Sequence, residues 1–509
     1  MGYANAAERV IFAVDPIQTE TNIFWEGVGD RVPGAQALIG HDPMTGEYTN
    51  NELAEFWEQS EGYTVWTVTL HPDAEFHFDW GPVTAEDVLF SYEMSTSETS
   101  TAVGRERIAG AIVAAIDERT IEFRYPDARF DWQFYNAGRG ALTIYSKAQF
   151  DAEGIEGLRE RPALTGPYQF MERRPGESLV VERVENHWQN RDADFAEIEM
   201  RYVAEPATKL ALILSGEAHA SDLPSELHAD ALATGMEIVE SNAPAMHTGA
   251  IFNGMYMTTG DPNANPDLPW ADVRIREAMN RAIDREALLD ILYAGGGTLI
   301  PKWGMDPRHE GFASELFDRF EEMYGYDPDR ARELLQEAGY PDAFSDPTIP
   351  LVSSVLAGNP EFGAMTELLD VFFTEIGLQT RIVEMDWPSL GAMGRAREAF
   401  VVNPIRNAPV RPTQPFINTF YTIDGTIFGG WEDDVIEEVA QQLNTETDPE
   451  LRDEIARQGF VHLFDTYAEI PMVAVNSRIV INPDVVANWE FPGISSSTLS
   501  HWHLIEAAE

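Results

Sequence analysis

Arginine side chains gather in one polar segment, residues 385–421, where they could bind a negatively charged group. Arg395 stands in its first half, and Arg406 and Arg411 follow a short apolar run. A guanidinium binds a carboxylate or phosphate through two parallel N–H donors, so this segment predicts a site for an anionic or strongly polar solute. The alternative is that Arg406 and Arg411 pair with some of the chain's own 86 acidic side chains. We favour the solute site.

No catalytic sequence pattern accompanies these arginines. The chain contains no GxSxG, HExxH, Walker-type GK[ST] or Rossmann GxGxxG sequence, so no residue is assigned as catalytic and no cofactor is expected. Gly295 to Gly297 form a lone glycine cluster that fits a flexible turn better than a phosphate loop. His501 and His503 could be a metal pair, but no third ligand stands beside them, and a terminal strand is the preferred interpretation.

One loop has the ligand spacing of a calcium site. Positions 1, 3, 5, 7 and 12 of the calcium-loop template are occupied by Asp261, Asn263, Asn265, Asp267 and Asp272. Position 6 is proline where the template needs glycine, and the last acid is the shorter aspartate. We therefore favour a solvated loop and expect no metal.

Composition excludes several classes of partner. The net charge is −52, from 86 acidic against 34 basic side chains, which opposes binding to nucleic acid or to anionic membranes. The acids are spread along the whole chain, as in a surface adapted to stay hydrated in salt. Cysteine is absent, so disulfides and thiol chemistry are excluded. Ala4 and Ala6 have the A-x-A arrangement that signal peptidase favours, so a trimmed export signal fits this start, and an ordinary cytosolic N-terminus fits it almost as well.

The stretch from His247 to Tyr293 predicts how the arginine segment is positioned. Ala250 to Met257 form an apolar run of strand length around Asn253. After a polar loop, apolar residues recur at helical spacing from Ile275 to Ile283, and Asp284 then predicts the N-cap of a second helix. A strand, loop and helix pair of this kind is typical of the entry into a new lobe.

The order of several motifs resembles that of the peptide-type solute-binding proteins of bacterial ABC importers, the extracytoplasmic family 5 group. The resemblance extends from about Asp15 to Pro471, and its motifs are Leu53-Ala54-Glu55, Phe76-His77, Thr84 to Ser91, Thr165 to Tyr168, Phe252 to Tyr256, Asp272 to Leu288 and Glu469 to Val475. Trp80 departs from the pattern, because glycine is common in that turn. The family also carries, on a loop, an aspartate that grips a peptide's ammonium group, whereas in this chain residues 406–411 occupy that loop.

The resemblance implies an α/β, two-lobed periplasmic-binding-protein fold of type II, cluster C-like, with an extra small accessory domain. The first lobe would comprise residues 1–40, 163–248 and 476–509, the accessory domain 41–162, and the second lobe 249–475. For Glu20 and Asn22 the alternative is that they begin the next helix. Arg406, Asn407 and Arg411 depart from the family pattern and are expected at the ligand because of their own chemistry. The full set of positions expected to contact the ligand is Glu20, Asn22, Asn253, Tyr256, Trp387, Arg395, Arg406, Asn407, Arg411, Thr413 and Phe416.

The function implied is that of a periplasmic or extracytoplasmic receptor that closes on a peptide or similar polar solute and delivers it to an ABC permease. We expect a monomer that binds no nucleic acid. The missing aspartate supports a rival ligand, a non-peptide anionic or hydroxylated solute such as an opine-like compound or an oligosaccharide. Two further functions fit the same scaffold: a hydrolase, and a receptor that docks to a signalling protein.

Overall fold

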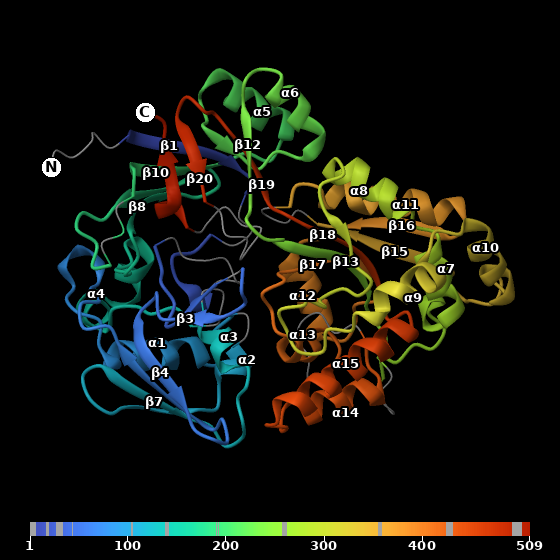
Figure 1. Ribbon diagram of the computed structural model, residues 1–509, viewed down its shortest axis with the longest axis horizontal. Coiled ribbons are helices and arrows are strands. Elements are labelled where there is room, and N and C mark those ends of the chain that lie inside the picture. The colour runs from blue at the N-terminus through green and yellow to red at the C-terminus, as the bar shows by residue number, and fades with distance from the viewer. Residues whose placement is uncertain are drawn as a thin grey trace.

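The computed structural model describes residues 7–16, 20–26, 34–42, 44–102, 105–137, 142–189, 191, 193–256, 262–354, 359–423, 431–490 and 501–509. Three β-sheet units make up these residues, and Figure 1 shows two of them stacked on the left and the third on the right. The mixed α/β, type II architecture predicted from the sequence is confirmed. None of the helices in the described ranges combines the length and the apolar character that a bilayer crossing needs.

The first lobe is built on a seven-stranded mixed sheet. β1 lies near its centre, parallel to both β10 and β11. The strands, in sheet order, are β12 (Glu237–Glu240), β19 (Arg478–Ile481), β11 (Ala220–Ser221), β1 (Ala7–Val14), β10 (Phe195–Tyr202), β9 (Ser178–Arg183) and β8 (Tyr168–Arg174). The other elements are η1 (Phe24–Glu26), α5 (Pro206–Ser215), η3 (Ser225–Leu227), α6 (His228–Leu232), β20 (Val486–Trp489), η5 (Trp502–Leu504) and β21 (Ile505–Ala507).

The accessory unit is a four-stranded antiparallel sheet with its own apolar core. Its strands, in sheet order, are β4 (Ala54–Gln59), β5 (Val65–Leu70), β7 (Thr120–Arg124) and β6 (Ile112–Ala115), and β2 (Gly40–His41) pairs with β3 (Tyr48–Thr49) beside them. The helices are η2 (His77–Asp79), α1 (Ala85–Thr96), α2 (Arg105–Ile108), α3 (Trp132–Asn136) and α4 (Lys147–Glu160). His77 is buried and its Nε2 lies 2.8 Å from the carbonyl oxygen of Gly166, so the scaffold role expected for it is confirmed.

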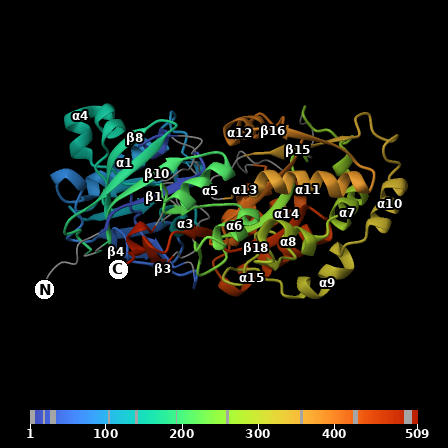
Figure 2. The same cartoon turned by 90° about the horizontal axis from the view of Figure 1, so that it is seen from above.

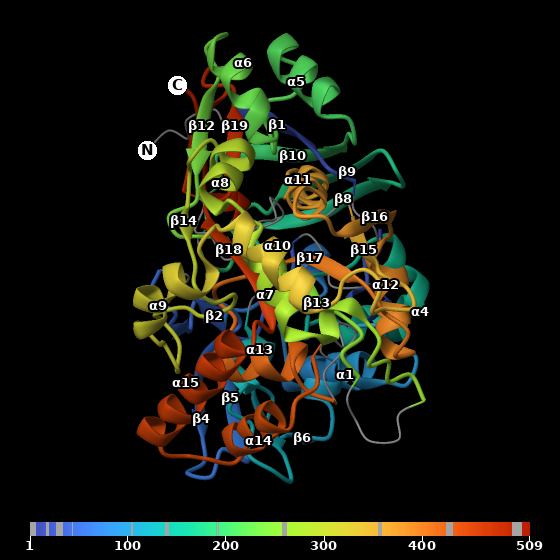
Figure 3. The same ribbon diagram turned by 90° about the vertical axis from the view of Figure 1, so that its right-hand side faces the viewer.

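The second lobe surrounds a six-stranded sheet with helices, and Figure 3 shows α7, α9 and α10 in front of that sheet. Its strands, in sheet order, are β14 (Thr298–Leu299), β18 (Glu469–Val475), β13 (Met246–Phe252), β17 (Val402–Asn407), β15 (Thr348–Ser353) and β16 (Gln379–Glu384). Its helices are η4 (Pro269–Ala271), α7 (Val273–Arg281), α8 (Arg285–Tyr293), α9 (Glu315–Tyr324), α10 (Pro328–Glu337), α11 (Phe362–Glu375), α12 (Trp387–Arg395), α13 (Thr413–Phe420), α14 (Asp434–Leu443) and α15 (Pro449–Asp465).

Two chain crossings connect the lobes, one between β12 and β13 and the other between β18 and β19 (Figure 1), and Figure 2 shows the two sides of the molecule from above. The crossings are hydrogen-bonded to each other. Ser241 donates its N–H to the carbonyl oxygen of Ser477 at 2.9 Å, and Ser477 donates its own N–H to the Ser241 hydroxyl at 3.0 Å. Ala245 donates to Val475 at 2.9 Å. A pair of short, mutually bonded segments is the kind of connection about which two lobes can hinge.

The helix pair expected after His247 is present. Ile275, Ala278, Met279, Ala282 and Ile283 are all buried in the core of the second lobe. Asp284 precedes α8, and its carboxylate accepts a hydrogen bond of 2.9 Å from the N–H of Ala287. The sequence prediction of an N-cap at Asp284 is therefore confirmed.

Replacing Asp284 with alanine removes this cap. We expect Asp284→Ala to lower the free energy of unfolding by about 1 kcal/mol, because the first turn of α8 loses an acceptor for one of its free N–H groups. Asp290→Ala, the same substitution at an exposed position of α8, is the matched control and should be close to neutral. Urea unfolding of both variants measures the difference, and equal stabilities would show that the cap contributes nothing.

Candidate functional site

The predicted site residues on β17 lie on two different faces of that strand. Arg406 and Asn407 belong to β17, so the prediction that they lie in a loop is wrong; the ladder with β13 extends as far as Asn407, which pairs with His247. Because side chains alternate along a strand, Asn403 and Asn407 share one face with His247, while Arg406 shares the other with Thr248. The side chains of Asn407 and Arg406 therefore lie on opposite faces of the sheet.

Arg411 lies on the Asn407 side. Its Nε donates to the Asn407 Oδ1 at 2.9 Å, and its Nη1 donates to the Thr419 hydroxyl at 3.2 Å. Both acceptors are neutral. No carboxylate pairs with Arg411 among the residues that the structure describes. The alternative that Arg411 pairs with one of the chain's own acids therefore fails within these residues.

The accessory unit supplies the opposite side of this site. The Arg411 guanidinium lies 5.3 Å from the centre of the Phe134 ring on α3, and the Arg107 Nη2 donates to the carbonyl oxygen of Asn418 on α13 at 2.8 Å. The Thr419 side chain is also hydrogen-bonded to Tyr135. Figure 1 shows α2 and α3 facing α13 across the middle of the molecule. The site therefore lies between the accessory unit and the second lobe.

Removing the charged Arg411 guanidinium from solvent costs free energy unless an anion balances its charge. Removal from solvent lowers the pKa of Arg411, and the positive charge of Arg107 lowers that pKa further, while Tyr135 opposes the shift. A desolvated cation beside a second cation is destabilising unless an anion joins them. The arrangement of Arg107 and Arg411 thus favours a bound anionic group.

Polar atoms without protein partners lie on the Asn407 face of the β13–β17 ladder and on β2. In the described part of the chain, neither side-chain nitrogen nor oxygen of Asn403 has a hydrogen-bond partner, and the same is true of the Asn407 Nδ2 and the His247 Nδ1. His41 of β2, in the accessory unit, also has both ring nitrogens unpartnered. A buried polar group left in this state costs roughly 1–3 kcal/mol unless a ligand or water supplies the bond.

Three histidines form an electrostatic group at this interface. Burial lowers the pKa of His41 and of His247 to about 4, and burial also lowers the pKa of His309. The charged groups facing them are Asp42, Asp306 and Arg308. All three histidines are therefore neutral at pH 7 and can offer one donor and one acceptor each.

Glu20 and Asn22 are bound to side chains and backbone of the protein itself, on the β8–β9 hairpin and on α4. Glu20 accepts a hydrogen bond of 2.7 Å from the N–H of Gly176 and lies 3.9 Å from the Arg173 guanidinium. Asn22 accepts from Arg173 at 3.0 Å and donates to the carbonyl oxygen of Arg159 at 2.7 Å. Neither residue begins a helix, since only η1, a three-residue turn, follows. Both hold the 20–26 segment on the β8–β9 hairpin.

The remaining predicted positions have packing contacts in this conformation. Phe416 is fully buried among Trp303, Phe420 and Phe460, and the Thr413 hydroxyl donates to the carbonyl oxygen of Glu310. Tyr256 lies under the Arg397 guanidinium, whereas the Asn253 carbonyl oxygen accepts from the Trp270 indole N–H. Trp387 begins α12, and Arg395 is exposed at its end. Contact of these residues with a ligand stays a prediction.

The two candidate metal segments are used otherwise. Asp272 caps α7 and pairs with Arg274, and Asp267 accepts from Ser345, while Asp261 lies outside the described residues. Trp502 lies in η5 and the strand begins only at Ile505, so the strand expected at His501 to His503 is wrong. In the described ranges, no three His, Asp or Glu side chains gather as a metal site would require.

Sequence reasoning missed the accessory-unit contribution to the site. Arg107, Phe134 and Tyr135 lie outside every motif of the resemblance, and α2 and α3 have only four and five residues. The one available signal was the aromatic cluster from Phe130 to Tyr135, whose burial against another unit cannot be read from spacing alone.

Comparison with known proteins agrees with this architecture. The "Glutathione-binding protein GsiB" of Salmonella typhi is 30% identical over 361 residues, covering 69% of this chain and 64% of that protein. The "Heme-binding protein A" of Haemophilus influenzae is 26% identical over 360 residues, covering 66% of this chain and 62% of that protein. The structure of DppA from Helicobacter pylori in complex with the peptide STSA superposes with a TM-score of 0.79 at 16% identity, covering 99% of each chain.

The family is shown by a match over most of the sequence. Residues 49–426 match the family model for "Bacterial extracellular solute-binding proteins, family 5 Middle". The relatives named above are binding proteins. The chain belongs to family 5 of the bacterial extracellular solute-binding proteins.

Proposed function

We propose that this chain is the extracytoplasmic receptor of an ABC importer and that it closes on a solute bearing a carboxylate, which binds at Arg411. The observation that carries the proposal is the half-buried Arg411 guanidinium, whose hydrogen-bond acceptors among the described residues are both neutral and which lies near a second guanidinium, Arg107. The Asn403 amide and the Asn407 Nδ2, which have no hydrogen-bond partner among the described residues, would complete the recognition of the solute.

Closure would bring the two sides of the site together. Arg107, Phe134 and Tyr135 belong to the accessory unit, and Arg411 and Asn407 to the second lobe. Rotation about the paired crossings at Ser241 and Ser477 would separate these groups and open the site. The receptor would work as a monomer with its membrane permease, and Glu20, Asn253, Trp387, Arg395 and Arg406 remain candidates for further contacts.

A short peptide is the leading ligand, and an opine-like anion is the second candidate. The named relatives include a glutathione-binding protein, which favours a peptide. Within the described residues, no carboxylate is paired with Arg411. A peptide's ammonium group therefore has no acid to bind at Arg411, and this favours the second candidate.

Thermal unfolding tests the proposal with matched ligands. We expect a bound tripeptide to raise the unfolding temperature, since a ligand at about 100 times its Kd stabilises the folded state by about 2.7 kcal/mol. The same peptide with an amidated C-terminus should give little or no shift. Equal shifts from acid and amide would contradict the role of Arg411, and shifts from opine-like acids alone would select the second candidate.

A receptor is expected to release its ligand chemically unchanged. A bound peptide should be recovered unchanged after long incubation with the protein, as mass spectrometry would show. Accumulation of cleaved products that scales with protein concentration would instead support the hydrolase alternative.

A further inference from the structure

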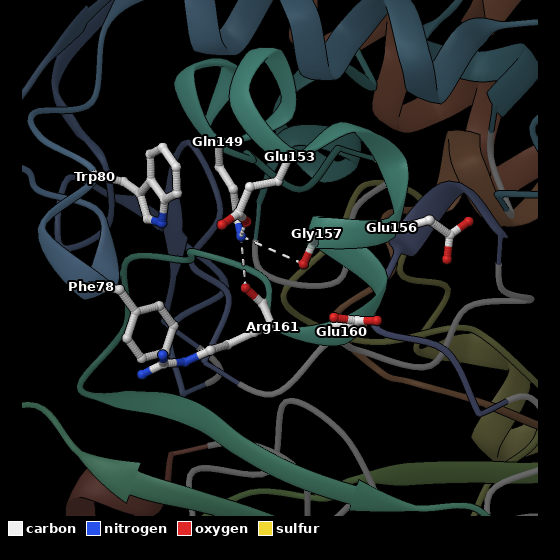
Figure 4. A pocket seen from close by; sticks show the side chains of 8 residues that line it. All are labelled: Phe78, Trp80, Gln149, Glu153, Glu156, Gly157, Glu160 and Arg161. Atoms are coloured by element: carbon white, nitrogen blue, oxygen red, sulfur yellow. Dashed lines mark hydrogen bonds between the residues drawn. The ribbon is translucent and has the colours of Figure 1, made fainter.

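A second concave site lies on the accessory unit, away from the residues proposed to bind the transported solute. It is a cavity of 410 Å³ between the η2 turn and helix α4 (Figure 4). Phe78 and Trp80 form one wall, and Glu153, Glu156 and Glu160 of α4 are among the residues that line the rest. Aromatic faces combined with carboxylates are the two features that attract organic cations.

One cation already rests on this aromatic wall. The Arg161 guanidinium lies 3.6 Å from the centre of the Phe78 ring, and Figure 4 shows the two groups face to face. This contact shows that the Phe78 ring accepts a planar cation from the cavity side. Trp80 is half-buried and has no ring or cation partner in the part of the chain that the structure describes. Trp80 is also the residue that replaces the glycine common in this turn.

The carboxylates differ in how far they are already neutralised. Glu156 pairs with Arg159 at 2.5 Å, whereas Glu153 and Glu160 have no cationic partner among the described residues. The Glu153 carboxylate is held in place by Gln149, a side chain that is 1% exposed, through a hydrogen bond of 2.9 Å. Gly157 makes this possible, because a Cβ there would collide with the Cβ of Glu153.

The walls of the cavity are anchored to the rest of the unit. Gln149 also donates to the carbonyl oxygen of Arg161 at 2.8 Å and accepts from the N–H of Ala163 at 2.8 Å. The η2 turn is held by the His77 Nε2, which lies 2.8 Å from the carbonyl oxygen of Gly166. Positioned carboxylates and a fixed aromatic wall lower the ordering cost of binding.

We propose that this cavity binds a small organic cation, with an alkylammonium or guanidinium head group on Trp80 and its charge balanced by Glu153 and Glu160. The Trp80 face supplies the cation–π contact, and the two unpaired carboxylates supply the counter-charge. Arg161 places a like charge in the same cavity, so its removal should improve binding. The site is independent of the solute proposed for Arg411.

Calorimetric titration of the whole chain with choline tests this proposal. Wild type should bind choline saturably, whereas neohexyl alcohol, the uncharged isostere of choline, should not bind. Trp80→Leu should weaken choline binding by about 5-fold or more, as expected for loss of one cation–π contact. Glu160→Gln should also weaken it, while Glu156→Gln, at a carboxylate already paired with Arg159, is the matched control.

A variant that is expected to tighten binding separates a change in the site from a loss of folding, because a misfolded protein would bind more weakly. Arg161→Ala frees the Phe78 ring and removes a like charge, so it should tighten choline binding, and thermal unfolding should confirm that each variant is folded. Arg411→Gln should leave choline binding unchanged. The proposal is overturned if wild type shows no saturable binding of choline or ethylguanidinium, or if Trp80→Leu and Arg161→Ala leave the affinity unaltered.

Discussion

Arg411→Gln is expected to weaken the binding of a carboxylated peptide by at least about 30-fold. The substitution removes the charged partner of the ligand's carboxylate in a desolvated site, a loss that typically costs about 2–5 kcal/mol. Glutamine keeps a polar nitrogen at the position of the Arg411 Nε, the atom that donates to Asn407. Calorimetric titration of both proteins with the same peptide measures the change in affinity.

Arg332→Gln is the matched control for that experiment. Arg332 is half-exposed on α10 and pairs with Asp329, far in sequence from the site and without a role in it. Its replacement should leave the affinity unchanged. If Arg411→Gln bound the peptide as tightly as Arg332→Gln does, the ligand's carboxylate would have to bind elsewhere.

The second large effect is a loss of stability in mild acid, which we expect because His247 at the same interface is buried in its neutral form. Burial lowers the pKa of His247 in the folded protein to about 4, against 6.5 for an exposed histidine. The unfolded chain therefore binds more protons than the folded one between these values, and the free energy of unfolding falls as the pH is lowered from 6.5 to 4. For His247 the full loss is about 3 kcal/mol.

A variant that cannot titrate isolates this contribution. In His247→Gln, the pH dependence of urea unfolding between pH 6.5 and 4 should be weaker by about that amount. Comparison with wild type is needed because Glu361 changes the free energy of unfolding with pH in the opposite direction. Burial raises the pKa of Glu361 to about 7, so its contribution to stability is lost as the pH rises. If the free energy of unfolding depended on pH in the same way in wild type and variant, the burial of neutral His247 would contribute nothing to the acid sensitivity.

Local sequence signals predicted the individual elements well. The Asp284 cap and the apolar stripe from Ile275 to Ile283 are present as expected. These features depend on contacts within a few residues or on burial of one face, both of which leave a periodic pattern in the sequence. The two-lobed α/β architecture followed from the order of such elements together with the family resemblance.

The composition of the site could not be predicted in the same way. Arg411 and Asn407 stand four residues apart and were both candidates, but Arg107 and Phe134 reach them only because the accessory unit packs against α13. The strand β17 also extends into the segment expected to be a loop, because its ladder with β13 continues to Asn407. Contacts between distant units are decided by tertiary packing, which leaves no local pattern.

The central claim is that Arg411 binds the carboxylate of the solute. A thermodynamic cycle tests it most directly: the affinities of wild type and Arg411→Gln are each measured by calorimetry for a peptide acid and for its C-terminal amide. We predict that amidation weakens binding strongly to wild type and hardly at all to Arg411→Gln, because the two changes remove the same interaction. Equal losses on amidation in both proteins would contradict the claim.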